Sequence, residues 1–175
     1  MSEIPQQIVL ERHRDLHSAV FNRAARWTLL SLLGAFLVLG LLNAFGQRPQ
    51  TLVLDTPQAR LSLYAPSHLR GGLLYEARFT VTAHRELKNV ALSLSPGWAE
   101  GMQVNTIEPS PIGEGSRNGD LMLTFGHVPA GQVLRFFMAF QTNATNLAWH
   151  RRADVTLYDG ARRLGSIHRT VTVFP

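Results

Sequence analysis

The stretch Trp27–Phe45, WTLLSLLGAFLVLGLLNAF, separates a short N-terminal arm from a longer C-terminal segment. It contains no charged residue, and its polar side chains are Thr28, Ser31 and Asn43. As a helix of about 1.5 Å rise per residue it would be about 28 Å long, close to the roughly 30 Å of a hydrocarbon core. A helix also satisfies its own backbone polar groups in lipid. The stretch therefore predicts one transmembrane α-helix over residues 27–45.

The basic residues on either side of this helix predict its orientation. The arm before it carries four of them, Arg12, Arg14, Arg23 and Arg26, whereas Arg48 stands alone directly after it. An excess of Arg marks the cytoplasmic side of a membrane helix. We therefore expect residues 1–26 to form a cytoplasmic juxtamembrane arm. The chain is then a single-pass protein of the cell membrane with an extracytoplasmic C-terminal domain.

A cleaved signal peptide is the alternative interpretation of the same stretch. Ala44 and Gly46 are small residues with a spacing that suits a signal peptidase. The arm of about 26 residues is long for a signal peptide, however, and the apolar run exceeds the roughly 7–15 residues of a typical signal core. These lengths favour an uncleaved anchor.

Composition excludes several classes of protein. The chain has 175 residues and no cysteine, which excludes disulfide frameworks, thiolate nucleophiles and Cys-ligated zinc. Its net charge is +5, from 17 basic and 12 acidic residues that are interspersed rather than grouped. Such a distribution gives weak attraction to anionic surfaces, and together with a place outside the cytoplasm it predicts no nucleic-acid partner.

After a linker over residues 46–50, the pattern changes from continuously apolar to alternating. The stretch 73–83, LLYEARFTVTA, places Tyr75, Ala77, Phe79 and Val81 on one face and polar residues on the other. A period of two is typical of a half-buried strand. Similar alternation recurs around residues 52–54, 61–63, 90–94, 102–106, 121–125, 134–140, 155–157 and 167–173.

This spacing of short strands predicts an all-β fold. We expect residues 51–175 to form an immunoglobulin-like β-sandwich of seven or eight strands, with Phe136 and Phe140 in its core and Arg135 outside. Asp159-Gly160 predicts a type I′ hairpin. The stretch 108–119, EPSPIGEGSRNG, lacks an apolar pattern and predicts the longest loop.

Several short motifs resemble a known group of domains. Pro129-Ala130-Gly131-Gln132 and the alternating strand after it resemble the turn and strand of bacterial immunoglobulin-like extracytoplasmic domains of the CARDB kind. Gly97-Trp98, the run from Asn105 to Pro109 and the run from Phe140 to Asn143 are similar to bacterial single-pass membrane proteins with such a domain. The resemblance implies a fold and a membrane-tethered layout, and it implies no catalytic residue.

No reaction motif appears in the chain, so we expect neither an enzyme nor a cofactor. The histidines of the domain lack the spacing of metal ligands. An alternative is that they converge in space with methionines to bind copper, as in a periplasmic metal chaperone or assembly factor. The residues involved would be His68, His84, His127, His150, His168, Met102, Met122 and Met138.

The remaining candidates for function are side chains that suit contact with a partner. Exposed Trp beside Arg is typical of contact anchors, and loops on a rigid scaffold often carry binding residues. The candidate contact residues are Trp98, Glu108, Glu114, Arg117, Trp149 and Arg151. The alternative interpretation of each Trp is that it caps an open end of the sandwich core, since aromatic side chains are usually buried. The sequence thus predicts an accessory or interaction protein that binds another membrane or envelope protein. The alternative is a cell-wall or carbohydrate-binding module that uses Trp98 and Trp149.

Overall fold

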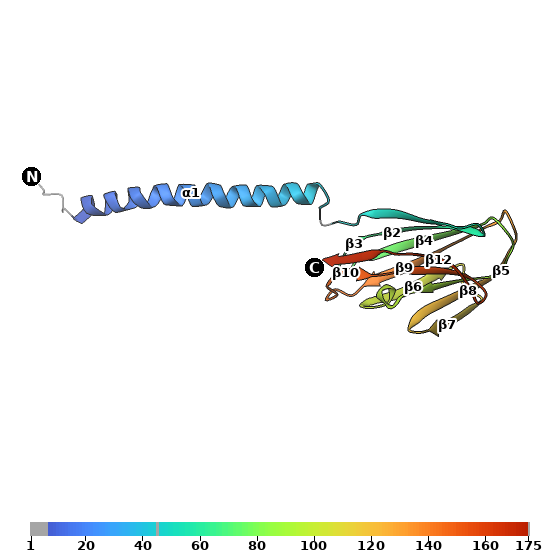
Figure 1. Ribbon diagram of the computed structural model, residues 1–175. Helices are drawn as coiled ribbons and strands as arrows, with labels where there is room; N and C mark the ends of the chain where they lie inside the picture. Colours follow the sequence, from blue (N-terminus) through green and yellow to red (C-terminus); the bar gives the residue numbers. More distant parts are fainter. Residues whose placement is uncertain (1–6, 45, 175) are drawn as a thin grey trace, which may run out of the picture. The chain divides into compact units, whose positions relative to one another are not determined.

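The computed structural model describes residues 7–44 and 46–174, and the helical side chains from Asn22 onward. The chain divides near residue 45 into two compact units, which are described separately. The first unit is a helix, and the second consists of β-sheets (Figure 1).

Helix α1 extends over Gln7–Leu41. Its part from Asn22 to Leu41 is 20 residues long and apolar enough to cross a membrane, and none of it is buried within the protein. A helix of that length is about 30 Å long, which matches a hydrocarbon core. The apolar helix is therefore confirmed, although it begins well before Trp27 and ends before Phe45.

The C-terminal end of α1 is set by Asn43, which has a left-handed backbone with φ of 54°. The N–H of Ala44 donates to the C=O of Leu39 over 2.9 Å, and the N–H of Asn43 donates to that of Gly40 over 3.0 Å. These two bonds form a Schellman motif, which satisfies carbonyls that the end of a helix leaves free. The motif explains why the helix stops at Leu41 although the apolar sequence continues.

The second unit is an immunoglobulin-like β-sandwich, as predicted. Its first sheet is antiparallel and has the order β1-β2-β4-β9-β6. These strands are β1 Pro49–Asp55, β2 Ala59–Pro66, β4 Leu74–Ala83, β9 Val133–Thr142 and β6 Met102–Glu108. The second sheet has the order β12-β11-β5-β8-β7. Its strands are β12 Arg162–Ile167, β11 Val155–Asp159, β5 Leu87–Leu94, β8 Asp120–Val128 and β7 Gly113–Arg117.

A small third sheet has the order β10-β13-β3. It comprises β10 Ala148–Arg152, β13 Thr170–Phe174 and β3 His68–Arg70, with β13 parallel to β3. The short 3₁₀ helix η1, Pro96–Trp98, follows β5. The described residues thus contain 13 strands, and the predicted number of seven or eight is wrong. Hydrophobic alternation locates strands that face the core, but it misses short or exposed ones such as β3 and β7.

The core lies between the two five-stranded sheets. On β4 the predicted inner residues Tyr75, Ala77, Phe79 and Val81 are all buried, and on β9 so are Phe136, Met138 and Phe140. Phe136 stacks on Phe79 with ring centres 4.6 Å apart and on Phe125 of the facing sheet at 4.3 Å. The predicted register of β9 is confirmed, because Phe136 and Phe140 point inward while Arg135 is exposed. These aromatic contacts join the two layers.

The second sheet contains two tight hairpins, of which the one at Asp159-Gly160 differs from the expected turn type. Asn118 and Gly119, with φ of 53° and 87°, connect β7 to β8 through the pair Arg117–Asp120. A type I′ turn requires positive φ at both central residues, so this is where that turn type fits. The predicted hairpin at Asp159-Gly160 is confirmed as β11–β12, but the turn type is wrong, since Ala161 has no positive φ beside the 59° of Gly160.

The stretch 108–119 contains a strand, so the prediction of one long loop is wrong. Residues Gly113–Arg117 form β7, which pairs with β8 at the edge of the second sheet. The strand is exposed along most of its length and therefore shows no apolar alternation. Backbone pairing to β8, rather than side-chain burial, holds it in place.

Candidate interaction surfaces

A kink joins the second sheet to the small third sheet. Ala153 and Asp154 lie between β10 and β11, opposite His168 and Arg169 between β12 and β13. The N–H of Ala153 donates to the C=O of Arg169 over 2.9 Å, so the two long segments stay paired through the bend. The kink thereby brings four charged or polar side chains close together, those of Arg152, Asp154, His168 and Arg169.

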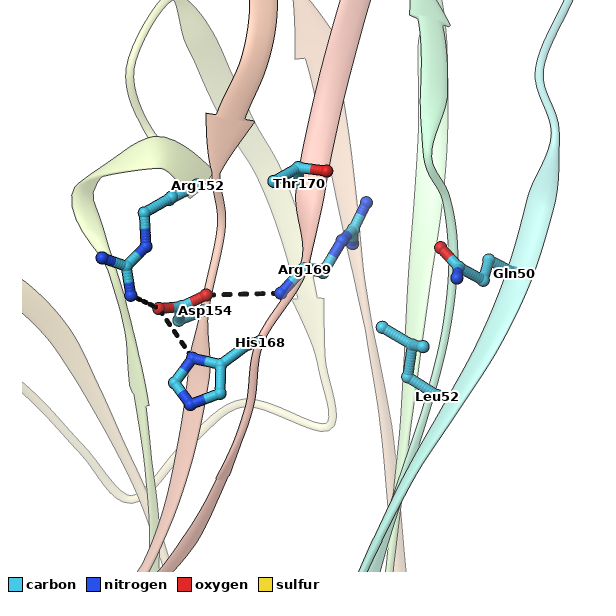
Figure 2. A pocket seen from close by; sticks show the side chains of 7 residues that line it. All are labelled: Gln50, Leu52, Arg152, Asp154, His168, Arg169 and Thr170. Atoms are coloured by element: carbon cyan, nitrogen blue, oxygen red, sulfur yellow. Dashed lines mark hydrogen bonds and ion pairs between the residues drawn. The ribbon is translucent and has the colours of Figure 1, made fainter.

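Asp154 is the centre of this kink (Figure 2). Its carboxylate accepts hydrogen bonds from Nη2 of Arg152 over 2.7 Å and from the backbone N–H of Arg169 over 3.3 Å. Nδ1 of His168 lies 3.1 Å from the same carboxylate. The backbone carbonyl of Asp154 accepts from Ser95 N–H over 3.1 Å and from the indole N–H of Trp98 over 3.2 Å. Asp154 therefore ties η1 to the kink.

The environment of Asp154 lowers the pKa of its carboxyl. Burial is the largest influence and would raise the pKa, but it is outweighed by the hydrogen bonds from His168, Arg152 and the Arg169 backbone together. A carboxyl with a lowered pKa stabilises the fold above its unfolded pKa of about 3.9. That contribution is lost as the pH falls through the folded pKa.

We expect Asp154→Asn to lower the free energy of unfolding at pH 7 by about 1–3 kcal/mol, because the charged hydrogen bonds of a carboxylate that is only 17% exposed are lost. The difference from the wild type should shrink below pH 4, where the wild-type carboxyl also becomes neutral. Chemical denaturation between pH 3 and pH 7 measures both effects. The control is Asp55→Asn, since Asp55 contacts His84 at 3.1 Å but is 60% exposed. A difference independent of pH would contradict the role given to the charge.

Arg169 is the buried cation of the kink, with 6% of its surface exposed. Its Nη2 donates to the C=O of Pro66 over 2.6 Å, and its guanidinium carbon lies 4.6 Å from the centre of the Trp98 ring. Nη1 has no hydrogen-bond partner among the described residues. Burial lowers the pKa of Arg169 to about 10, with nearby Tyr75 opposing the shift, so the side chain is a cation at neutral pH. The face of Trp98 supplies a cation–π contact in place of a carboxylate.

A hollow of about 400 Å³ lies beside the kink. Its lining consists of Gln50, Leu52, Arg152, Asp154, His168, Arg169 and Thr170. Figure 2 shows that Arg152 and His168 converge on Asp154, whereas the guanidinium of Arg169 points away from Asp154, to the side of Gln50. The charged groups of this hollow are engaged with one another or with the backbone. The arrangement suits a structural junction between sheets.

A second, more apolar hollow of about 260 Å³ lies over β4, β6 and β9. Its lining consists of Arg78, Phe79, Thr80, Glu108, Pro109, Arg135, Phe136 and Phe137. Shortly after Pro109 follows Ile112, whose side chain is 74% exposed and whose N–H donates to the C=O of Thr124 over 2.8 Å. The hollow combines an aromatic lining with Arg and Glu side chains. Such a combination fits the apolar side chain of a partner, held by charged groups around it.

The candidate contact residues fall in three different places. Glu108, Glu114 and Arg117 are exposed in the segment 108–117, where Arg117 also lies 5.5 Å from the ring centre of Tyr158. Trp149 is 74% exposed on β10. These four residues stay available for contact.

Trp98 and Arg151 need correction. Trp98 is 2% exposed and packs against Phe79 and Phe140, with ring centres 5.8 and 5.5 Å away, so its prediction as a contact residue is wrong. Its indole fills the end of the core beneath η1. The side chain of Arg151 is 15% exposed and is engaged by Glu100 and Asn146 inside the domain.

The alternatives for function lose their expected geometry. A sugar-binding aromatic row would need Trp98 and Trp149 on one surface, and only Trp149 is exposed. Within the described parts of the chain, no group of three or more His, Asp or Glu side chains is placed to hold a metal ion. A metal site made of histidines and carboxylates is therefore not found in those parts. His84, His127 and His168 pair instead with separate carboxylates.

The residues that the sequence interpretation missed are apolar side chains outside the core, of which Phe137 is half-buried and Ile112 is exposed. Phe137 alternates with the core residues Phe136 and Met138, so the period of two in β9 already indicated an outward aromatic. Ile112 lies between two turn-rich runs, and no pattern in the sequence separates it from an ordinary loop residue. Its exposure next to β7 is visible only in three dimensions.

Comparison with known proteins gives distant structural likenesses. No family model and no curated protein matches the chain. The solution structure of CaCohA2 from Clostridium acetobutylicum is similar at 14% identity and a TM-score of 0.44, over 69% of this chain and 93% of that one. The alkylpurine DNA glycosylase AlkC of Pseudomonas fluorescens, bound to DNA with an abasic site analog, has 14% identity and a TM-score of 0.33, over 74% of this chain.

A third likeness is to the GH20 exo-β-N-acetylglucosaminidase of Vibrio harveyi in complex with N-acetylglucosamine, at 12% identity and a TM-score of 0.30, over 73% of this chain. The chain spans 31% of the length of the glycosylase and 18% of that of the glucosaminidase. The described chain is one apolar helix followed by an immunoglobulin-like β-sandwich.

Proposed function

We propose that this chain is a membrane-anchored interaction protein. Helix α1 would span the cell membrane with its N-terminal end in the cytoplasm, and the sandwich would bind another membrane or envelope protein outside it. The observation that carries the proposal is the segment 108–117, which combines exposed Ile112, the edge strand β7 and the apolar hollow beside Pro109. The proposal includes no catalytic step.

The edge of β7 supports a protein partner. β7 is the last strand of its sheet, and among the described strands it pairs with β8 alone. An edge strand presents unpaired backbone groups that an extended segment of another protein can join. Glu114 and Arg117 place opposite charges on this strand, and charged side chains on an edge discourage indiscriminate pairing. The partner would therefore need charges complementary to these two.

Anchoring makes a modest contact sufficient. A domain tethered by α1 shares the plane of the membrane with its partner, which raises the effective concentration of both. The Arg residues before the helix support the proposed orientation through the positive-inside rule. The resemblance to CARDB-like extracytoplasmic domains agrees with this layout and remains part of the proposal.

Ile112→Asp tests the proposed contact. An exposed apolar anchor in a protein interface often contributes 2 kcal/mol or more, or about thirty-fold in affinity. We expect the amount of partner that co-purifies with the full chain from a mild detergent extract to fall at least tenfold in the variant. The melting temperature of the variant should stay nearly unchanged. Quantitative mass spectrometry of the purified complex measures the loss.

The matched control is Val53→Asp. Val53 is also exposed, at 47%, but it lies on β1, the edge of the other sheet. It should retain the partner at the wild-type level. Equal retention by Ile112→Asp would show that segment 108–117 is not the contact. Failure of any protein to co-purify, together with retention of wall glycans, would replace the proposal by the sugar-binding alternative.

A further inference from the structure

One end of the sandwich carries four exposed apolar side chains. These are Leu73 and Leu74 before and in β4, Leu147 before β10, and Trp149 in β10, with exposed fractions of 46%, 60%, 63% and 74%. We call these four residues the apolar end patch. Clustered apolar side chains on a protein surface mark sites of contact with proteins or membranes.

Backbone contacts hold the loops of this patch together. The N–H of Thr142 donates to the C=O of Leu73 over 3.1 Å. A side chain on Gly71 would come within 2.8 Å of the carbonyl oxygen of Ala144, so the loop that leads to Leu147 packs closely on the turn before β4. The patch thus joins two loops that lie far apart in the sequence.

Phe174 connects the same turn to Trp149. The N–H of Gly71 donates to the C=O of Phe174 over 2.8 Å, and the rings of Trp149 and Phe174 meet edge to face with centres 6.2 Å apart. Figure 1 shows β3, β10 and the C-terminal end of the chain at the end of the sandwich where β1 begins. The four apolar residues therefore belong to one end of the domain.

The chain enters the sandwich from α1 at this same end. The side-chain amide of Gln47 donates to the C=O of Leu74 over 3.0 Å, and Ser67 N–H donates to the C=O of Arg48 over 2.9 Å. Gln47 follows Leu41, the last helical residue, by about six residues, which span at most about 20 Å when extended. The apolar end patch is thereby tethered within reach of the membrane surface.

We infer that the apolar end patch inserts into the interfacial layer of the bilayer that α1 spans. The inference rests on the proposed membrane anchor. Trp side chains are enriched at the boundary between hydrocarbon and headgroups, and transfer of Leu side chains from water into this layer is favourable. Arg70 ends β3, three residues before Leu73, and Arg48 follows Gln47, whose side chain contacts Leu74. The positive charge of both residues suits anionic headgroups. Insertion would fix the orientation of the sandwich on the membrane.

Tryptophan quenching by brominated lipids tests this inference on the full chain in vesicles of mixed neutral and anionic lipid. The chain has three Trp residues, of which Trp98 is buried in the core. In a Trp27→Phe chain, the remaining exposed indole is Trp149, and we expect lipids brominated high on the acyl chain to quench it. Adding Leu74→Glu should abolish most of that quenching, whereas adding Val53→Glu, at an exposed site on β1, should not.

The companion variant Trp149→Phe separates this inference from the anchor. Its exposed indole is Trp27, within the part of α1 that is apolar enough to cross a membrane, and quenching of Trp27 reports the anchor alone. Quenching of Trp27 without quenching of Trp149 would overturn the inference and keep the anchor. Absence of both would overturn both. Shielding of Trp149 only when the co-purifying protein is added would assign the patch to that protein and also overturn the inference.

Discussion

Gly97→Ala is expected to lower the melting temperature of the sandwich by about 10 °C or more. A Cβ atom at this position would lie 1.8 Å from the carbonyl oxygen of Arg152, which is part of a paired strand. Because the obstacle is backbone, η1 would have to move away from β10 and take Trp98 with it. Overpacking of this kind costs about 3 kcal/mol or more, and each kcal/mol shifts the melting temperature of such a domain by several degrees.

Thermal unfolding followed by circular dichroism measures this effect. Gly115→Ala is the matched control, because Gly115 has nothing within 4 Å of the added atom and needs no positive φ. It should change the melting temperature little. A small effect of Gly97→Ala would mean that η1 does not lie directly on β10.

Phe136→Ala should cost about 3–5 kcal/mol, the range for deletion of a large aromatic from a packed core. Phe136 is 3% exposed and touches the rings of Phe79 and Phe125, so its loss leaves a cavity between the two sheets. A domain of this size has a total stability of about 5–15 kcal/mol, and the variant should therefore be close to unfolding at 37 °C. Urea denaturation at 25 °C measures the loss.

Arg135→Ala serves as the control for the register of β9. Arg135 is exposed on the opposite face, and truncation of an exposed side chain usually changes stability by less than about 0.5 kcal/mol. A one-residue slip of the strand would exchange the two faces. Similar losses in Phe136→Ala and Arg135→Ala would therefore show that the register is wrong.

The sequence predicts the elements whose side chains alternate between core and solvent. The alternation of apolar and polar residues predicts the inner faces of β4 and β9 residue by residue, because buried positions such as Phe79 and Phe136 recur at every second residue. The apolar helix was predicted for the same reason, although its end at Leu41 depends on the left-handed backbone of Asn43. β7 was missed, since Gly113–Arg117 is held by backbone pairing, which leaves no hydrophobic pattern.

The two tryptophans illustrate why the candidate contacts were predicted less well. Trp98 follows the turn residues Pro96-Gly97 and Trp149 precedes Arg151, yet Trp98 is buried and Trp149 is exposed. The difference depends on Asp154 and Arg169, which come from other parts of the chain. Asp154 itself carries no sequence signal, because its partners are brought together only by the kink between sheets. Ile112 likewise becomes a candidate only when β7 is placed beside it.

The hydrogen bond between Arg169 and Pro66 limits how early the domain can complete its folding. This hydrogen bond joins residues 103 positions apart, and the parallel pairing of β13 with β3 joins equally distant segments. Contacts between such distant segments slow folding, because a long loop must close before they form. The cation–π contact between Arg169 and Trp98 also forms only after this loop has closed. During synthesis, the sandwich would therefore stay open until its last strand has left the ribosome.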